Sequence, residues 1–360
     1  MRYPYHVFCW LLLSLLFAST APAQPLGSLN ATPDPRTSVL GSVRTAAAGD
    51  PTAWGSNPAT IADSATVGAF LSNRNAPWIE GEIGYSEIGM WWSNPSYGAV
   101  SINYSHLGLG EVQQVFQNGQ LGAIVRSYDD LLSVTIASPS IEGFRVGATV
   151  KQFTTSTLAV FGSDSGFSSN LPVYGSGVWL DAGATYQLPL TLHGNAEGPL
   201  CFGVAVRDLG GDMTYDEPSI QTPIATWLNL GAALTIPFPE FEGAIGVGVG
   251  TSLQLTSVDG LSAPTSGDRQ NQFDAGLQLQ AYGLSLRLGL HRQTVDDPYA
   301  EQSTLSPRYG FGVNLPLRQL GINAPLILDF DYGLLPLNAR ASFTTEQNVH
   351  ALQLRASFLL

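Results

Sequence analysis

The sequence predicts an all-β protein, a transmembrane antiparallel β-barrel of about fourteen strands with an N-terminal plug segment. Three observations lead to this fold class. Only 12% of the 360 residues are charged, whereas 44% are hydrophobic. Apolar residues recur at every second position through most of the chain, which is typical of strands and not of helices. Beyond the N-terminus, no run of about 18 uninterrupted apolar residues offers a membrane-spanning helix.

Residues 1–23 are typical of a secretory signal peptide. Arg2 supplies the positive charge, 7–18 is an apolar run, and 21–23 reads Ala-Pro-Ala, a small–x–small cleavage pattern. The apolar run is shorter than the roughly 20 residues that a transmembrane helix needs. We therefore expect an exported protein whose mature chain begins at Gln24.

Residues 65–360 carry the period of two and form the predicted barrel. Leu286 and Leu288 alternate with Arg287 and Gly289, so this segment has one apolar and one polar face. Segments of about ten residues or more can cross a bilayer at a tilt, and an even strand number is typical of outer-membrane barrels. The fourteen segments are 65–73, 79–92, 97–107, 127–138, 143–155, 174–188, 199–209, 226–237, 241–255, 270–281, 283–293, 306–315, 324–334 and 346–360.

The connections between these segments alternate in length, with long polar loops expected on one rim and short turns on the other. A soluble β-sandwich or propeller exported to the periplasm would also alternate and is the competing fold. Ionisable residues on the polar face favour a barrel with a wet or polar-packed lumen. The long connections are 108–126, 156–173, 210–225, 256–269 and 294–305.

Some local features of the strands carry their own predictions. The alternation changes phase near Glu87-Ile88, which predicts a β-bulge. Glycines on one face of the segment 246–250 would let a plug or a curved wall approach closely. Aromatic residues in or beside strands are candidates for girdles at the membrane interfaces. They are Trp91, Trp92, Tyr97, Tyr104, Trp227, Tyr309 and Tyr332.

Residues 24–64 differ from the rest and form the predicted N-terminal extension and lumenal plug or hatch. The part 24–37 is Pro-rich and is expected to be extended or disordered. Asn57 followed by Pro58 predicts a short helix that reaches about Asp63. A fourteen-stranded barrel is too wide for wall side chains alone to fill, which favours a plug. A simple turn on the periplasmic rim is the alternative.

A family resemblance lies in two motifs. The pattern Asp50…Ala53-Trp54-x-x-Asn57-Pro58-Ala59-x-Ile61-Ala62 resembles the N-terminal motif of the PorV/PorQ family of outer-membrane proteins, within the FadL-like β-barrel superfamily. The run 202–210 is similar to the family's strand ending in Val-Arg-Asn-Leu-Gly, here Arg207-Asp208-Leu209-Gly210 with Asp208 in place of Asn. The resemblance implies a barrel with a lumenal hatch. Its plug-motif residues are Asp50, Trp54, Asn57, Pro58 and Ala59.

The residue patterns indicate no enzyme, cofactor or metal site. The histidines of the mature chain have no His, Cys or Glu neighbour at metal-ligand spacing, and no Gly-x-Ser-x-Gly elbow occurs. The net charge is −13 with 15 basic residues, so a nucleic-acid partner is not expected. We therefore predict a non-enzymatic protein with no catalytic residues.

Charged residues on the polar face predict a lumenal polar network. Such a network would act as plug anchors, as a selectivity lining, or as salt bridges that merely hold the barrel. Its predicted members are Arg145, Asp274, Arg287, Asp329, Asp331 and Arg355.

The function implied by the resemblance is a component of type IX-like protein secretion in the bacterial outer membrane. Its partners would be membrane lipid, secretion-system subunits and secreted cargo, gripped by the loops 156–173, 210–225 and 256–269. The alternative is a FadL-like channel for hydrophobic small molecules with an apolar pocket under the loops. A general solute porin is the third hypothesis. The pocket residues expected for the FadL-like channel are Phe161, Phe167, Leu171 and Val173.

Overall fold

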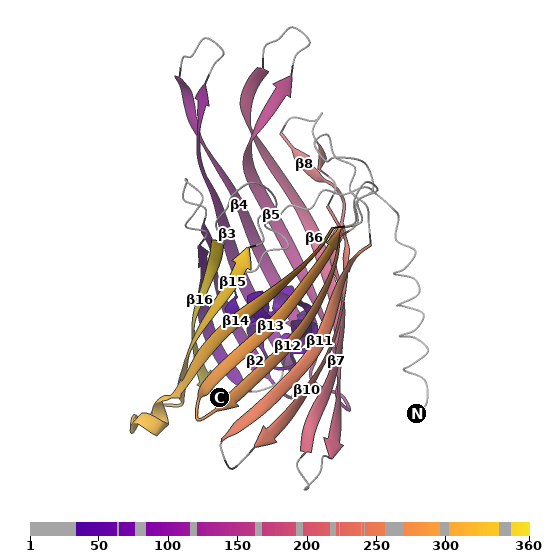
Figure 1. The fold of residues 1–360 in the computed structure, drawn as a ribbon, viewed down its shortest axis with the longest axis vertical. Helices are drawn as coiled ribbons and strands as arrows, with labels where there is room; N and C mark the ends of the chain where they lie inside the picture. Colours follow the sequence, from indigo (N-terminus) through magenta and orange to yellow (C-terminus); the bar gives the residue numbers. More distant parts are fainter. Residues whose placement is uncertain are drawn as a thin grey trace.

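A computed structural model of the chain describes residues 34–62, 65–75, 84–115, 121–162, 168–191, 197–216, 221–222, 224–238, 240, 242–255, 270–295, 302–337 and 347–360. In this part of the chain, fourteen antiparallel strands form a closed ring, drawn in Figure 1. Pairing of β1 with β16 closes the ring. The predicted signal peptide lies outside the described residues. The prediction of a closed fourteen-stranded barrel is confirmed.

Each of the fourteen predicted segments coincides with one strand of the ring. The strands are β1 (Thr66–Asn75), β2 (Gly84–Asn94), β3 (Gly98–Val115), β4 (Leu121–Ala137), β5 (Phe144–Gly162), β6 (Ser168–Thr191), β7 (Glu197–Gly210), β10 (Trp227–Phe238), β11 (Gly243–Gln254), β12 (Gln270–Ala281), β13 (Leu284–Val295), β14 (Gln302–Pro316), β15 (Leu326–Leu337) and β16 (Gln347–Leu359). Two short strands, β8 (Met213–Tyr215) and β9 (Gln221–Thr222), lie between β7 and β10 in the chain. β8 pairs with β6.

The two faces of the ring strands differ as the period of two predicts. On β13 the side chain of Leu286 is 59% exposed, whereas that of its neighbour Arg287 is 3% exposed. Leu284, Leu288 and Leu290 are also exposed on the same outward face. The outward apolar side chains suit contact with lipid, and the buried polar ones suit a packed lumen.

Two predicted loops are largely strand. Within 108–126, β3 continues to Val115 and β4 begins at Leu121, and within 156–173, β5 continues to Gly162 and β6 begins at Ser168. Backbone pairing in these hairpins needs no apolar face, because a tilted strand of about 9–11 residues has already crossed the bilayer. The sequence alternation therefore fades before the strand ends.

The predicted bulge at Glu87-Ile88 is wrong. β2 pairs with β1 and with β3 without a register shift, and Glu87 faces inward while Ile88 faces outward. Tyr85 is a buried aromatic residue on the inward face. Because the other inward positions are mostly polar, this ring makes the alternation in the sequence look shifted by one residue. Register shifts occur instead on β3, beyond Gly108, and between β6 and β7 around Leu180.

The candidate girdle aromatics divide into two groups. Trp91 and Trp227 are 4% and 3% exposed and point into the barrel, so the girdle prediction is wrong for them. Both belong to the inward-facing positions of their strands, which sequence position alone does not reveal. The remaining candidates, exposed or half-buried on the outside or at a turn, are Trp92, Tyr97, Tyr104, Tyr309 and Tyr332.

The two ends of the barrel are unlike. One end carries short turns such as 95–97 and 282–283, and the 3-10 helix η6 (Leu317–Leu320). The other end carries the β3–β4 and β5–β6 hairpins, which rise well beyond the remaining strands in Figure 1. Short turns lie on the periplasmic side of outer-membrane barrels. We therefore name the short-turn end the periplasmic end.

Residues 34–62, here called the lumenal segment, fold into four short helices inside the ring. They are α3 (Pro35–Leu40), η1 (Gly41–Ala46), η2 (Pro51–Gly55) and η3 (Pro58–Ile61), drawn in indigo in Figure 1. The helix predicted at Pro58 is present and ends at Ile61. Residues 35–37 are helical, so the prediction of an extended chain is wrong there. No helix in the described part of the chain is long and apolar enough to cross a membrane.

Three of these helices begin with the same dipeptide pattern. Asp34-Pro35, Asp50-Pro51 and Asn57-Pro58 each place an Asx side chain at the N-cap and a proline at the first helical position. The Asx oxygen accepts backbone N–H groups that the first turn leaves unbonded, and proline needs no such bond. The helices are thus encoded locally, although each is too short to be stable alone in water.

Candidate functional site

The lumenal segment touches the wall where inward-facing positions are glycine. A Cβ atom at Gly203 on β7 would collide with the carbonyl oxygen of Thr45, and one at Gly289 on β13 would collide with that of Val39. Only a residue without a side chain permits backbone to lie this close to backbone. Gly250 of β11 lies against the backbone of Ser42 in the same way, and Gly248 lies against the side chain of Val43. The wall is therefore shaped to receive the segment.

Asn57 joins the lumenal segment to itself and to the wall. Its Nδ2 donates to the carbonyl oxygens of Thr45 at 2.8 Å and Ala184 of β6 at 3.0 Å. Its Oδ1 accepts from the backbone N–H of Ala59 at 3.0 Å, which caps η3. The residue is fully buried. One amide thus satisfies three buried backbone groups, which explains why neither a shorter nor a charged side chain would serve.

The other plug-motif residues lie on the same segment. Asp50 caps η2 by accepting from the Thr52 N–H at 3.0 Å. Trp54 donates its indole N–H to Glu87 Oε1 on β2 at 2.9 Å. Pro58 and Ala59 begin η3 and are buried. The motif therefore supplies both helix starts and contacts with the wall.

An arginine–aspartate network links the lumenal segment to β13, β15 and β16. Asp50 accepts from Arg36 Nη1 at 3.0 Å and from Arg44 Nη1 at 2.7 Å. Arg36 Nη2 reaches Asp331 Oδ2 of β15 at 2.8 Å. The network has equal numbers of positive and negative groups. Its members are Arg36, Arg44, Arg287 and Arg355 with Asp34, Asp50, Asp329 and Asp331.

The arginines around Asp50 hold its carboxyl group in the ionised form. Burial alone raises the pKa of the Asp50 carboxyl, but the guanidinium groups of Arg44, Arg36 and Arg355 outweigh it and hold that pKa well below its ordinary value. Asp50 thus remains a carboxylate at neutral pH. Buried pairs of this kind lose much of their attraction to desolvation, and removing a single partner is the destabilising event.

The structure places the six residues of the predicted lumenal network on the inner face, four of them within the arginine–aspartate network. Arg287 pairs with Asp331 at 2.6 Å and Arg355 with Asp329 at 2.9 Å, both within the arginine–aspartate network. Asp274 belongs to a separate cluster, in which its carboxylate accepts from the Ser42 N–H at 2.8 Å and lies 2.7 Å from His291 Nδ1. Arg145 is buried on β5, where it is paired in register with Thr185.

The family strand motif at the end of β7 contributes Asp208 as a partner of a buried lysine. Lys151 of β5 lies 2.7 Å from Asp181 of β6 and 2.8 Å from Asp208. Asp208 adopts a φ of 59°, a left-handed conformation that Asp and Asn tolerate better than most residues. Arg207 Nη2 lies 3.7 Å from the Asp208 carboxylate. Leu209 is in register with Leu180, and Gly210 abuts the ring of Trp179.

Several residues of these clusters were not predicted from the sequence. Arg36, Arg44 and Asp34 lie in a segment without strand periodicity, so no face could be assigned to them. Lys151 is the one lysine of the chain and falls on the polar face of its strand. These two facts could have predicted a buried ion-pair cluster at Lys151, because an isolated lysine in a lumen needs carboxylate partners.

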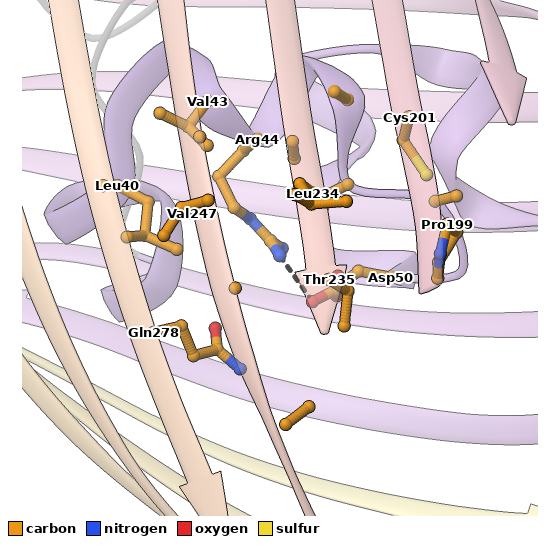
Figure 2. Close-up of a pocket in the computed structure, with 18 of the residues that line it drawn as sticks. Leu40, Val43, Arg44, Asp50, Pro199, Cys201, Leu234, Thr235, Val247 and Gln278 are labelled. Atoms are coloured by element: carbon orange, nitrogen blue, oxygen red, sulfur yellow. Dashed lines mark hydrogen bonds and ion pairs between the residues drawn. The ribbon is translucent and has the colours of Figure 1, made fainter. Parts of the chain in front are cut away.

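A cavity of ≈ 330 Å³ lies between the lumenal segment and the wall at the periplasmic end. Figure 2 shows Leu40 and Val43 on one side of it and Gln278 on another, with Arg44 directed toward Asp50. Cys201 of β7 and Thr235 of β10 line the wall side. The cavity therefore has both apolar and hydrogen-bonding surfaces.

The described part of the chain contains no group of three His, Cys, Asp or Glu side chains arranged to hold a metal ion. Of the pocket residues expected under the loops, Val173 is buried. Phe167 and the side chains of Phe161 and Leu171 lie outside what the structure describes, as does the loop 256–269.

The arrangement defines a class of protein: a closed membrane barrel whose lumen holds an N-terminal helical segment. No protein-family model and no curated protein sequence matches the chain. Among solved structures, it is similar to a deltaS2S3 mutant of the monoaromatic hydrocarbon channel TodX, with 11% identity and a TM-score of 0.51. The match covers 90% of this chain and 97% of that one.

The chain is also similar to a FadL homologue from Pseudomonas aeruginosa, with 11% identity and a TM-score of 0.51. This match covers 94% of this chain and 99% of that one. At such low identity the likeness shows the fold alone. The fold is that of the FadL-like outer-membrane barrels, so the FadL-like fold that the resemblance implies is confirmed.

Proposed function

We propose that the protein is an outer-membrane channel for small hydrophobic molecules, in which the lumenal segment plugs the barrel. The observation that carries the proposal is the occupied lumen. The segment contacts β12 through Asp274, β15 through Asp331 and β6 through Ala184, so it is tied to several sides of the ring. A lumen closed in this way does not suit a general solute porin, which needs an open aqueous path.

The comparisons support the chemical class of the solute. One similar structure is a monoaromatic hydrocarbon channel by name, and both similar structures share the FadL-like fold. Function does not follow from fold alone, because one fold hosts several functions. The proposal therefore adds the amphiphilic cavity at the periplasmic end, which gives a small molecule a place beside the plug.

The test is uptake in a Gram-negative host that lacks its own channel for hydrophobic compounds. Cells that express the full chain are expected to take up labelled toluene faster than cells with an empty vector. Uptake of a labelled sugar is expected to stay unchanged. The exposed variant Arg318→Ala serves as the matched control and should behave like the parent. Equal toluene uptake with and without the chain, at matched amounts of folded barrel, would overturn the proposal.

A role in type IX-like secretion as a PorV/PorQ-like protein is the second candidate, and one observation favours it. β3, β4, β5 and β6 have 18, 17, 19 and 24 residues, well above what a bilayer requires. The two hairpins therefore extend past the membrane, where a partner protein could bind. Of the predicted docking loops, 156–173 is mostly hairpin and 210–225 contains β8 and β9.

Shortening the β3–β4 hairpin by removing 109–123 separates the two functions. The secretion role predicts loss of crosslinked partner proteins in the native membrane with toluene uptake unchanged. The channel proposal alone predicts no specific crosslinked partner with either chain. A chain that retains every partner after this deletion and the equivalent one in β5–β6 would exclude these hairpins as the docking surface.

A further inference from the structure

The cavity at the periplasmic end combines features of a binding site for one kind of small molecule. Its volume of ≈ 330 Å³ falls at the lower end of the range for ligand sites, about 300–1,000 Å³. The cavity has the lumenal segment on one side and the inner face of the barrel on the other. The barrel side is formed by β6, β7 and β10 to β12. A second cavity shares Gln187 and Pro199 with it and lies beside the β6–β7 connection. The site thus adjoins a further hollow at the periplasmic rim.

The apolar part of the lining comes from both walls. Leu40 and Val43 pack together on the lumenal segment, and Ala233 of β10 packs against them. Gly246 and Gly276 line the wall opposite, and a Cβ atom at Gly276 would lie 2.8 Å from Leu40 Cδ2, so glycine lets the lumenal segment lie close to the wall there. This surface suits a flat or short apolar body, because dispersion contacts require close approach on both sides.

The charged groups at the edge of the cavity are already paired with partners inside the protein. Arg44 donates from Nη1 to Asp50 at 2.7 Å, and its Nη2 and Nε donate to threonine hydroxyls at 3.1 and 3.4 Å. Arg36 donates from Nε to Asp331 at 2.8 Å and from Nη1 to Asp50 at 3.0 Å. A charged ligand would have to break this network or remain unpaired, and both are costly.

Uncharged hydrogen-bonding groups complete the lining. Gln187, Thr235, Gln278 and Gln280 come from β6, β10 and β12. The amide oxygen of Gln278 accepts from Arg287 Nε at 3.3 Å, which orients its amide nitrogen as a donor. Such groups can bond a hydroxyl or carbonyl of a ligand and discriminate against one that lacks it.

We propose that this cavity binds an uncharged small molecule with an apolar body and a single hydroxyl or carbonyl group, such as a simple phenol. The inference deepens the proposed channel function and rests on it for the source of the ligand. Binding itself is measured without transport, so the two can fail separately.

The experiment uses the full chain in lipid nanodiscs and fluorine NMR of three probes of similar size. They are 4-fluorophenol, 4-fluorotoluene and 4-fluorobenzoate, which carry a hydroxyl, a methyl and a carboxylate group. We expect saturable binding of 4-fluorophenol, at least about tenfold tighter than either other probe, since one buried hydrogen bond or one unpaired charge is worth about that factor. Empty nanodiscs supply the partition background.

Two variants locate the site. Ala233→Phe fills the cavity from β10 and should abolish saturable binding of 4-fluorophenol. Ala232→Phe places the same ring on the lipid side of the same strand and should leave binding unchanged. Should Ala233→Phe fail to fold, Gln187→Leu tests the polar lining instead. In this variant the affinity for 4-fluorophenol should come within about threefold of the affinity for 4-fluorotoluene.

Each outcome has one meaning. Equal binding of 4-fluorotoluene, equal or tighter binding of 4-fluorobenzoate, or no saturable binding would each overturn the inference. Toluene uptake without 4-fluorophenol binding overturns the site and leaves the channel function. Binding of 4-fluorophenol without toluene uptake overturns the channel function and leaves the site.

Discussion

The Arg36 guanidinium lies 2.8 Å from the Asp331 carboxylate, although the two residues are 295 positions apart in the chain. This contact joins the first helix of the lumenal segment to β15. Arg36 also contacts Asp50 within the segment, so one side chain ties the segment both to itself and to the wall. The lumenal segment is thus held by charge as well as by its fit against the wall glycines.

Removing Arg36 tests whether this contact secures the segment. Arg36→Ala leaves Asp50 and Asp331 each short of a partner in a buried setting. We expect a loss of unfolding free energy near the lower end of about 3–5 kcal/mol, because the side chain is 15% exposed. Urea titration measured by tryptophan fluorescence gives the value. The exposed Arg318→Ala should change it by less than about 0.5 kcal/mol, and equal effects of both variants would contradict the role of the network.

Asn57 offers a way to separate helix capping from attachment to the wall. Asn57→Asp keeps the oxygen that caps η3 but loses the donor to Thr45 and Ala184. We expect a loss of about 1–3 kcal/mol, since two buried carbonyl groups lose their donor. The side chain of Asn94 at the β2–β3 turn accepts from the Ser96 N–H. Asn94→Asp should therefore be neutral in the same urea titration, and a neutral Asn57→Asp would disprove the attachment.

A methyl group at Gly203 should displace the lumenal segment without preventing barrel formation. The new Cβ meets the carbonyl oxygen of Thr45, and overpacking of this kind costs about 1–3 kcal/mol. We expect Gly203→Ala to retain the heat-modifiable mobility of a folded barrel but to be cleaved faster within the segment by added protease. Gly211→Ala has open space around the new methyl and is the control. Unchanged cleavage in Gly203→Ala would show that the contact is not tight.

Acid should weaken the lumenal network only at low pH. The folded-state pKa of Asp50 is depressed by Arg44, Arg36 and Arg355, so its stabilisation is present above the unfolded value of about 3.9 and is lost as the pH falls toward the lower folded value. We expect the contribution of Asp50 to the free energy of unfolding in urea to stay nearly constant between pH 7 and 5. Below about pH 4 this contribution should decrease. Asp50→Asn should be less stable at pH 7 and should lose less on acidification. An identical pH dependence in both chains would contradict this account.

The strand pattern follows from the sequence alone. Leu286 and Arg287 occupy successive positions and meet lipid and lumen respectively, so each residue reports the surroundings of its own face. The same local logic gives the Asn57-Pro58 helix start. It misleads where an inward aromatic such as Tyr85 breaks the alternation, and where paired strands continue past the membrane.

The fit between the lumenal segment and the wall was decided only by the tertiary structure. Asn57 meets Ala184 across 127 residues and Arg36 meets Asp331 across 295. Such contacts depend on where the segment enters the ring and how it turns between its helices. Periodicity carries no information about either, because it records which face a residue occupies and not which residue lies opposite.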